Sequence, residues 1–298
     1  MKLSGFSYIR NGLELGYPFL ESIKSALPVC DEFVIAVGDS SDGTREAIQA
    51  LNSPKIKIID TVWDMALRKD GKIFAQQTNL ALDNITGDWA LHIQADEVLH
   101  EKDTPKIRKA IEEVDKDDRV EGFIQPFLHF WGNYHYVRNS RRVHKYEVRI
   151  FRNRGLIRSF RDSQGFRKYS SMEAYLNGEK GEKLAVIKLD VPVFHYNAVR
   201  PVSQMKKKVI AFDSAYTTEI DEKSERYSEF DYQKIDRLER FNGSHPKVMN
   251  SRIEEMKDDF IFDPKKAVWA AKDRIMQPIE DFLGFKFGEY KNYKLLRR

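Results

Sequence analysis

The chain has little of what marks several large classes of protein. One cysteine, Cys30, stands in 298 residues, which excludes an intramolecular disulfide and a zinc site built from cysteines. No apolar run approaches the roughly 20 residues needed to span a bilayer, and the start lacks the long apolar stretch of a signal peptide. We therefore expect a cytoplasmic protein. The net charge of +4 is small for a chain with 32% charged residues, so composition does not predict a nucleic-acid partner.

Strand-like and helix-like patterns alternate through the first hundred residues. Short apolar runs predict strands at 3–9, 33–37, 56–59 and 89–93, and apolar residues recur at helical spacing between them. This alternation is typical of an α/β protein with a mostly parallel central sheet and right-handed crossovers.

The pattern changes past residue 104. A predicted helix around 107–114 is followed by strand-like segments at 122–124, 148–151 and 184–196, so we expect a mixed second half. From residue 201 onward the pattern is chiefly helical, and the last predicted helix contains Pro278, which should bend or interrupt it.

The most informative segment, 87–97, reads GDWALHIQADE. Its apolar run predicts a buried central strand, and Asp96 and Glu97 follow at the carboxyl end. Ligands of open α/β sheets bind at that edge, where carboxylates can hold a hard cation against phosphates. The first hypothesis is metal-assisted diphosphate chemistry. The alternative is that the two acids cap the next helix or face water in a turn.

Several motifs, taken in order, resemble the nucleotide-sugar-dependent glycosyltransferases of the GT-A fold, within the broad family 2 group. The branch they resemble attaches sugars to lipopolysaccharide cores and other surface glycans, and the resemblance covers roughly residues 3 to 210. The matching segments are the Asp-rich turn DSSDGT at 39–44, Asn79-x-Ala81 followed by TGDW at 86–89, QADE at 94–97 in place of Asp-x-Asp, RIFR at 149–152 and FHY at 194–196.

This resemblance implies a Rossmann-like, mostly parallel sheet flanked by helices. It divides the chain into a nucleotide-sugar-binding and catalytic domain over 1–200 and a mainly helical C-terminal extension over 201–298. It also implies an inverting, hexosyltransferase-type enzyme. The donor is a nucleotide-sugar, a UDP-sugar by default, and the acceptor is a glycan or lipid-linked molecule in surface polysaccharide or lipopolysaccharide biosynthesis.

Two alternatives stay open. One is a non-catalytic nucleotide- or glycan-binding protein of the same fold. The other is a sugar nucleotidyltransferase, which would normally show a Gly-rich phosphate loop near its first strand, and the segment 4–12 does not supply one.

The resemblance implies a nucleotide site at the ends of the first two strands. Ser7, Tyr8 and Arg10 would lie near the base and diphosphate, with Tyr8 stacking on the base and Arg10 pairing with phosphate. Simple packing and a solvated arginine are the alternative. Asp39 would accept hydrogen bonds from the base or ribose, although aspartate also suits a turn for its own sake.

The same resemblance implies a Mn²⁺ or Mg²⁺ site. Gln94 and Ala95 would lie against the nucleotide, Asp96 would contact the cation, and Glu97 would bind through water or orient its neighbours. His195 would be a second ligand, or simply a polar residue at a strand end. Because Gln94 replaces the first aspartate of the motif, one negative charge is missing and metal dependence is open.

An inverting transferase also needs a base that takes the proton of the acceptor hydroxyl. Asp162 is the first candidate because it follows the RIFR segment at about the distance seen in the family, and Glu173 is the second. Asp162 also suits a surface pair with Arg158 or Arg161.

Two basic regions complete the prediction. Cations and aromatics crowd 138–154, which suits an acceptor loop that binds sugar and phosphate; a solvated run and a nucleic-acid stripe are the alternatives, and no nucleic-acid motif accompanies it. The residues 206–208, the last two arginines and an amphipathic helix with Val268, Trp269, Ile275 and Phe282 suit peripheral contact with the inner membrane surface. An apolar helix stripe usually packs on the core, so we expect this helix to pack on the catalytic domain.

Overall fold

The computed structural model describes residues 1–163, 165–221, 227, 229–256 and 260–297. Arg298, one of the arginines in the predicted membrane contact, lies outside this part. Within it, no helix combines the length and apolar character needed to cross a membrane.

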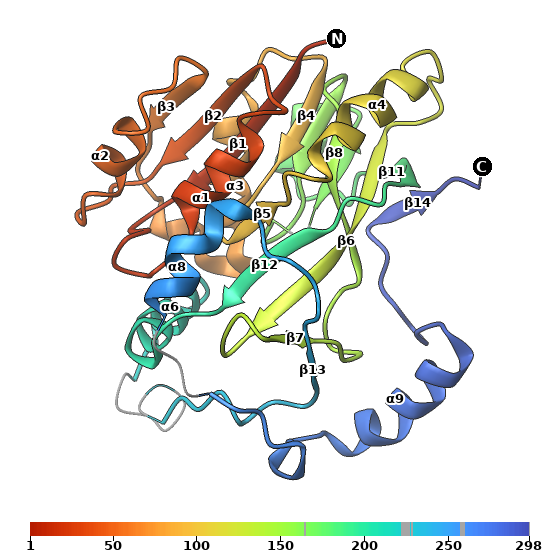
Figure 1. The fold of residues 1–298 in the computed structure, drawn as a ribbon. Helices are drawn as coiled ribbons and strands as arrows, with labels where there is room; N and C mark the ends of the chain where they lie inside the picture. The colour runs from red at the N-terminus through yellow and green to blue at the C-terminus, as the bar shows by residue number, and fades with distance from the viewer. Residues whose placement is uncertain (164, 222–226, 228, 257–259, 298) are drawn as a thin grey trace.

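A large mixed sheet organises the described residues (Figure 1). The strands of the first half are β1 Leu3–Ile9, β2 Glu32–Val37, β3 Ile56–Asp60, β4 Trp89–His92 and β5 Glu97–Leu99. Those that follow are β6 Gly122–Trp131, β7 Tyr136–Arg138, β8 Tyr146–Arg152, β9 Leu156–Ser159, β10 Phe166–Tyr169, β11 Glu182–Lys188, β12 Val193–Ala198, β13 Leu238–Arg240 and β14 Tyr293–Leu295.

Helices cover the sheet and form much of the C-terminal part. The α-helices are α1 Phe19–Ala26, α2 Thr44–Gln49, α3 Lys72–Leu82, α4 Thr104–Val114, α5 Met172–Leu176, α6 Val202–Ser214, α8 Asn250–Glu255 and α9 Ala271–Leu283. Three short 3₁₀ helices are η1 Met65–Gly71, η2 Lys247–Met249 and η3 Pro264–Lys266.

The first half of the sheet is parallel, in the order β3-β2-β1-β4. Beyond it, β8 runs antiparallel to both β4 and β6, while β6 is parallel to β11 and β12. The predicted α/β class, with a parallel first half and a mixed second half, is confirmed. Because parallel strands end at one edge, the residues after β1, β2 and β4 meet there.

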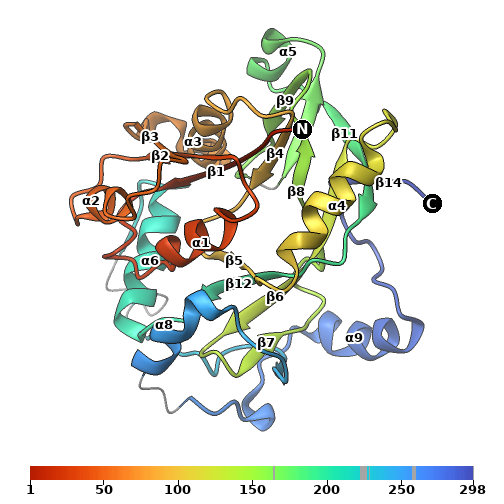
Figure 2. The ribbon, with the colours of Figure 1, turned by 45° about the horizontal axis from the view of Figure 1, so that its top comes forward.

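Alternating side chains of the strands build a core on each face of the sheet. On one face, Leu3 and Phe33 pack with α1, α2 and α4, and on the other Phe6 and Val34 pack with residues of and just after α3. Figure 2 shows α1 and α4 on the same side of the sheet. Two buried faces explain why the strands read as nearly continuous apolar runs.

The predicted strand 184–196 is two strands, β11 and β12. Pro192 lies between them and has no N–H to donate to a ladder, so the chain changes partners there. As a result, β12 runs between β5 and β6 and places His195 opposite both Glu97 and His129.

The C-terminal part returns to the sheet as well as forming helices. β14 pairs with β11, and β13 pairs with β7. Pro278 was expected to bend or interrupt the last helix, and α9 continues through it without interruption. Proline removes the hydrogen bond to the carbonyl four residues earlier, at Arg274, and that residue is exposed, so water can satisfy the carbonyl. The expected packing of the helix's apolar stripe on the catalytic domain is wrong, since Ile275 and Phe282 are 66% and 90% exposed.

Candidate active site

A cavity of about 530 Å³ opens at the carboxyl ends of β1 and β4. The sequence-predicted residues that line it are Tyr8, Arg10, Gln94, Ala95, Asp96, Asp162 and His195. Residues more than a hundred positions apart therefore meet in one place. A larger cavity, about 740 Å³, lies between the β6–β7 turn and the start of α6 and is lined by none of the predicted residues.

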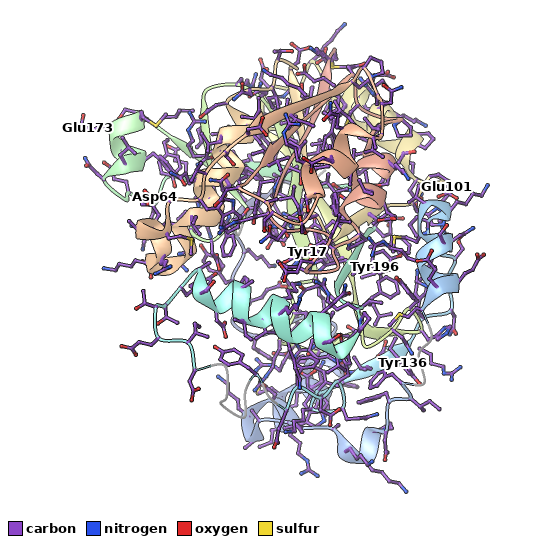
Figure 3. All side chains as sticks on the ribbon, turned by 90° about the vertical axis from the view of Figure 1, so that its left-hand side faces the viewer. Tyr17, Asp64, Glu101, Tyr136, Glu173 and Tyr196 are labelled. Atoms are coloured by element: carbon purple, nitrogen blue, oxygen red, sulfur yellow. The ribbon has the colours of Figure 1, made fainter. Side chains whose placement is uncertain are left out.

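Four of the predicted residues do not line the cavity: Ser7, Asp39, Glu173 and, as described below, Glu97. Ser7 is buried in β1 and is not part of the lining. Asp39 is half-exposed and accepts a hydrogen bond of 2.9 Å from Arg10 Nη2, so it acts on the cavity through that arginine. Glu173 is exposed on α5, and Figure 3 shows it at the outer edge of the molecule, far from Tyr17 in the cavity wall. Its position argues against Glu173 as a base.

Asp96 is buried between two groups that can carry positive charge. Lys208 Nζ, from α6, lies 3.3 Å from Asp96 Oδ2, and His195 Nε2 lies 3.6 Å from Oδ1. The Tyr196 N–H donates to the Asp96 carbonyl at 2.7 Å, which ties β12 to this loop and fixes His195 beside the carboxylate. The loop after β4 is held in turn by the Ser22 hydroxyl, which donates to the Gln94 carbonyl.

The charges of this pair depend on burial and on each other. Burial by itself raises the pKa of the Asp96 carboxyl, but Lys208, His195 and Arg200 outweigh it and hold that pKa well below its usual range. Burial, followed by Arg200, lowers the pKa of Lys208, and Asp96 opposes that shift. Asp96 therefore carries its negative charge in a site where water cannot solvate it.

The hydrogen-bond network assigns the tautomer of His195. The His144 carbonyl can only accept, so His129 Nε2 donates to it at 2.8 Å, and the pKa of His129 is lowered to about 3 by burial and by His195. His129 is thus neutral and accepts at Nδ1, where His195 Nδ1 lies 2.8 Å away and donates. His195 therefore faces Asp96 Oδ1 with its other ring nitrogen, Nε2.

This arrangement fits two ligands of one divalent cation. A separation of 3.6 Å between Asp96 Oδ1 and His195 Nε2 suits two metal bonds of about 2.1 Å each. A hydrogen bond from the second ring nitrogen is what orients metal-binding histidines. Among the described residues no group of three or more histidines, cysteines or acids could hold a metal, so phosphate oxygens or water would have to complete such a site.

Glu97 is occupied elsewhere. Its Oε2 and Oε1 accept from Arg149 Nε at 2.9 Å and Nη2 at 2.7 Å, and both side chains are at most 5% exposed. Oε2 also accepts from the Gln94 N–H at 3.0 Å. Glu97 begins β5, and through its contact with the Gln94 N–H it orients the chain before Asp96. Direct metal binding by Glu97 would require breaking its buried ion pair with Arg149.

Asp162 faces the cavity from the loop after β9. The Tyr216 hydroxyl donates to its Oδ2 at 2.7 Å, while the buried Oδ1 has no hydrogen-bond partner among the described residues. Asp162 is not paired with Arg158, which binds Asp83 instead. One carboxylate oxygen is positioned by a tyrosine and the other remains available.

An aromatic wall closes the side of the cavity beyond Tyr8. The Tyr8 ring lies 6.3 Å, centroid to centroid, from both the Trp63 and the Phe74 ring. Phe212 of α6 stacks on Phe74 at 5.5 Å. Arg10 lies over Trp63, at 5.5 Å from its centroid. The buried Trp63 Nε1 and Arg10 Nε have no hydrogen-bond partner among the described residues.

Several site residues escaped the sequence argument, among them Trp63, Tyr216, Lys208 and Glu147. Lys208 belongs to a run of three lysines that suggested a lipid-binding surface, yet its side chain is only 8% exposed and turns inward. Glu147 lines the same cavity, and burial raises its pKa to about 7. Its one available signal is its spacing of two from Arg149 on β8, which places both side chains on one face of the strand.

The cationic segment 138–154 is mostly neutralised inside the structure. Its ion pairs are Arg138 with Asp236, Arg141 with Asp273 and Glu280, Arg142 with Asp273, Arg149 with Glu97, and Arg154 with Asp118. The prediction of a free phosphate-binding loop is therefore wrong for these arginines, because acids distant in sequence take their charges.

Comparisons with known proteins find likeness in structure only. No family model and no curated protein matches the chain. Residues 1–349 of S. aureus TarS share 16% identity, with a TM-score of 0.39 over 74% of this chain and 67% of that one. The same fragment in complex with UDP-GlcNAc shares 14%, with a TM-score of 0.37, over 74% and 68%. A longer TarS structure shares 15%, with a TM-score of 0.40, over 71% of this chain and 39% of that one. These values are low, so the function is argued from the residues of the site.

Proposed function

We propose that the chain is a GT-A glycosyltransferase that transfers a sugar from a nucleotide-sugar, by default a UDP-sugar, to a glycan or lipid-linked acceptor. The observation that carries the proposal is the single cavity lined by Tyr8, Arg10, Asp96, Asp162 and His195. An aromatic wall, an arginine, a buried carboxylate at a strand end and a separate carboxylate with one oxygen unpaired in the described residues are groups that this reaction can use. The motifs of the sequence favour an acceptor in surface polysaccharide or lipopolysaccharide assembly.

The donor would lie across the ends of β1 and β4. The base would stack in the aromatic wall beside Tyr8 and Trp63, where the Trp63 Nε1 donor is unused. Arg10 would exchange part of its contact with Asp39 for a phosphate, and Lys208 and Arg200 add positive charge near Asp96.

Asp162 would act as the base of an inverting reaction. Its Oδ1 takes the proton of the acceptor hydroxyl while that oxygen bonds to the anomeric carbon, and the bond from that carbon to the diphosphate breaks. The electron pair of the broken bond leaves with the diphosphate. Tyr216 holds the other carboxylate oxygen and fixes the direction of Oδ1.

A divalent cation, if bound, would be held by Asp96 and His195, and would supply positive charge to the departing diphosphate. Lys208 lies on the opposite oxygen of Asp96, so the chain places a cation of its own beside the same carboxylate. Both charges favour the leaving group.

A thermal-shift screen tests donor binding. UDP-, GDP-, dTDP- and CDP-sugars are each added with and without Mn²⁺, and a true donor at about 100 times its dissociation constant should add roughly 2.7 kcal/mol to the free energy of unfolding. The Asp96→Asn variant should lose the part of the shift that depends on Mn²⁺. If none of the four nucleotide classes stabilises the chain, the proposal is contradicted.

Turnover separates the enzyme from a binding protein. We expect slow hydrolysis of the donor that stabilises the chain most, and faster transfer when acceptor glycans are supplied. Binding without turnover across the acceptor panel would favour the non-catalytic alternative, and release of pyrophosphate from a nucleoside triphosphate with a sugar phosphate would favour the nucleotidyltransferase.

A further inference from the structure

Helix α9 has its polar side against the protein and its apolar side in solvent. Its buried residues are Asp273, Gln277 and Glu280, which lie on one face. The opposite face carries Ile275, Ile279 and Phe282, and Phe282 is 90% exposed. A surface helix of a soluble domain normally has the reverse arrangement.

The inward face is fixed by charge. Arg141 Nη1 contacts Asp273 Oδ1 at 2.6 Å, its Nε and Nη2 each contact Glu280 at 3.0 Å, and its backbone N–H donates to Gln277 Oε1 at 2.6 Å. Arg142 Nε adds a second contact to Asp273 at 2.6 Å. Rotating the helix to bury its apolar side would break all of these contacts at once, so the exposure of the apolar side follows from the structure.

Apolar exposure extends beyond the helix at both ends. We call the following set the apolar ridge: Val268, Ile275, Ile279, Phe282, Leu283, Phe285 and Phe287, which are between 43% and 90% exposed. Figures 1 and 2 show α9 at the periphery, away from the central strands. Large apolar side chains exposed together at such a position indicate an interaction surface.

The charges beside the ridge are positive. The acids of α9 are paired within the molecule. Asp273 and Glu280 bind arginines of the segment between β7 and β8, and Asp281 binds Arg237. The basic residues of the same region are exposed and, in the described part of the chain, have no ion-pair partner: Lys265, Lys266, Lys272 and Arg274. A row of apolar side chains flanked by free cations is complementary to an anionic lipid surface.

We propose that α9 and its flanks dock on an anionic membrane surface, with the apolar ridge at the boundary of headgroups and acyl chains and the four cations at the phosphates. A second copy of the chain is a poorer occupant. In a two-fold dimer the same patch meets itself, so the cations of both copies would be brought into one interface.

The position of the ridge relative to the candidate active site is consistent with a membrane-borne substrate. Lys286, just after α9, lines a small cavity of about 290 Å³ together with His144 and Glu147, and those two residues also line the candidate active-site cavity. A docked α9 would bring the membrane beside this second cavity. This last point rests on the proposed function, whereas docking itself does not.

Vesicle flotation of the full chain tests the docking. The vesicles are phosphatidylcholine alone or with about one-third phosphatidylglycerol, and binding is expected only to the anionic vesicles and to weaken in high salt. The double variant Ile275→Ser, Phe282→Ser should lose at least about tenfold in binding, because burying even one such side chain is worth roughly that factor. The charge variant Lys265→Glu, Lys266→Glu should lose the preference for anionic lipid by about tenfold or more.

Leu176→Ser is the matched control, since it removes an apolar side chain that is 74% exposed on α5. It should bind vesicles as the unmodified chain does. Three results would overturn the docking. The first is that the unmodified chain does not float with anionic vesicles, and the second is that Leu176→Ser loses as much vesicle binding as the double variant. The third is that the unmodified chain is a dimer that binds no vesicles and that the double variant is a monomer. Unchanged melting temperatures verify that the variants fold. Failure of every nucleotide-sugar to bind would end the enzymatic proposal and leave this one standing.

Discussion

Replacing Lys208 with methionine should destabilise the chain more than a lysine substitution normally does. Methionine keeps much of the apolar stem and removes the ammonium that lies 3.3 Å from Asp96 Oδ2. The two side chains are 8% and 10% exposed, so water cannot replace the lost charge. Asp96 would then be a buried carboxylate that has lost the ammonium in contact with its Oδ2.

The size of the effect follows from the burial of the pair. Removing one partner of a buried ion pair costs about 3–5 kcal/mol, because the other charge stays desolvated. Lys208 also donates to the carbonyl and the side-chain oxygen of Asn197, and both lose a donor. The neighbouring Lys207 pairs with Glu14 on the surface, with exposures of 58% and 43%, so Lys207→Met should cost only about 0–1 kcal/mol.

Urea unfolding followed by circular dichroism measures both variants, with and without Mn²⁺. In Lys208→Met, added Mn²⁺ should recover part of the loss, since a cation bound at Asp96 takes the place of the ammonium; at about 100 times its dissociation constant it returns roughly 2.7 kcal/mol. A loss within about 1 kcal/mol of that in Lys207→Met would refute the buried pair. No recovery with Mn²⁺ would refute Asp96 as a metal ligand.

Three further predictions concern the same cavity. Asp162→Asn should lower kcat by about 10²–10⁴-fold and leave the thermal shift with donor unchanged, and a parallel loss of donor binding would mean that Asp162 is not the base. Trp63→Ala should weaken nucleotide binding by about 1–3 kcal/mol in a titration, whereas an unchanged affinity would place the base elsewhere. Burial raises the pKa of Glu147 from 4.5 to about 7, so between these values the folded chain holds a proton that the unfolded chain releases. The free energy of unfolding therefore falls as pH rises across that range. The advantage of Glu147→Gln over the unmodified chain in urea unfolding should therefore grow by up to about 3 kcal/mol from pH 4.5 to 8, and a constant difference would contradict it.

Much of the first half was predictable because its signals are local. The apolar run at 3–9 matches β1 in full, and the strand and helix patterns to residue 114 correspond to elements of the structure. A short apolar run between turn residues admits few conformations, and parallel strands must end at one edge. Asp96 was found in this way, since it directly follows a recognisable strand.

The roles predicted from the sequence were wrong for residues whose neighbours come from distant segments. Asp96 and Glu97 are adjacent and alike, yet one faces the cavity and the other is bound by Arg149, because β5 begins at Glu97 and pairs with β12. Nothing local distinguishes the inward Lys208 from the exposed Lys207 beside it.

The sequence by itself determined the alternation of elements and the acids that follow its strands, because hydrophobic spacing and turn residues act over a few positions. Only the tertiary structure decided which charges are free. Lys208 reaches Asp96 across 112 positions, and Arg141 turns the polar side of α9 inward from 132 positions away. Such pairings depend on the path of the whole chain, and they determine which carboxylate faces the cavity and which side of a helix faces solvent.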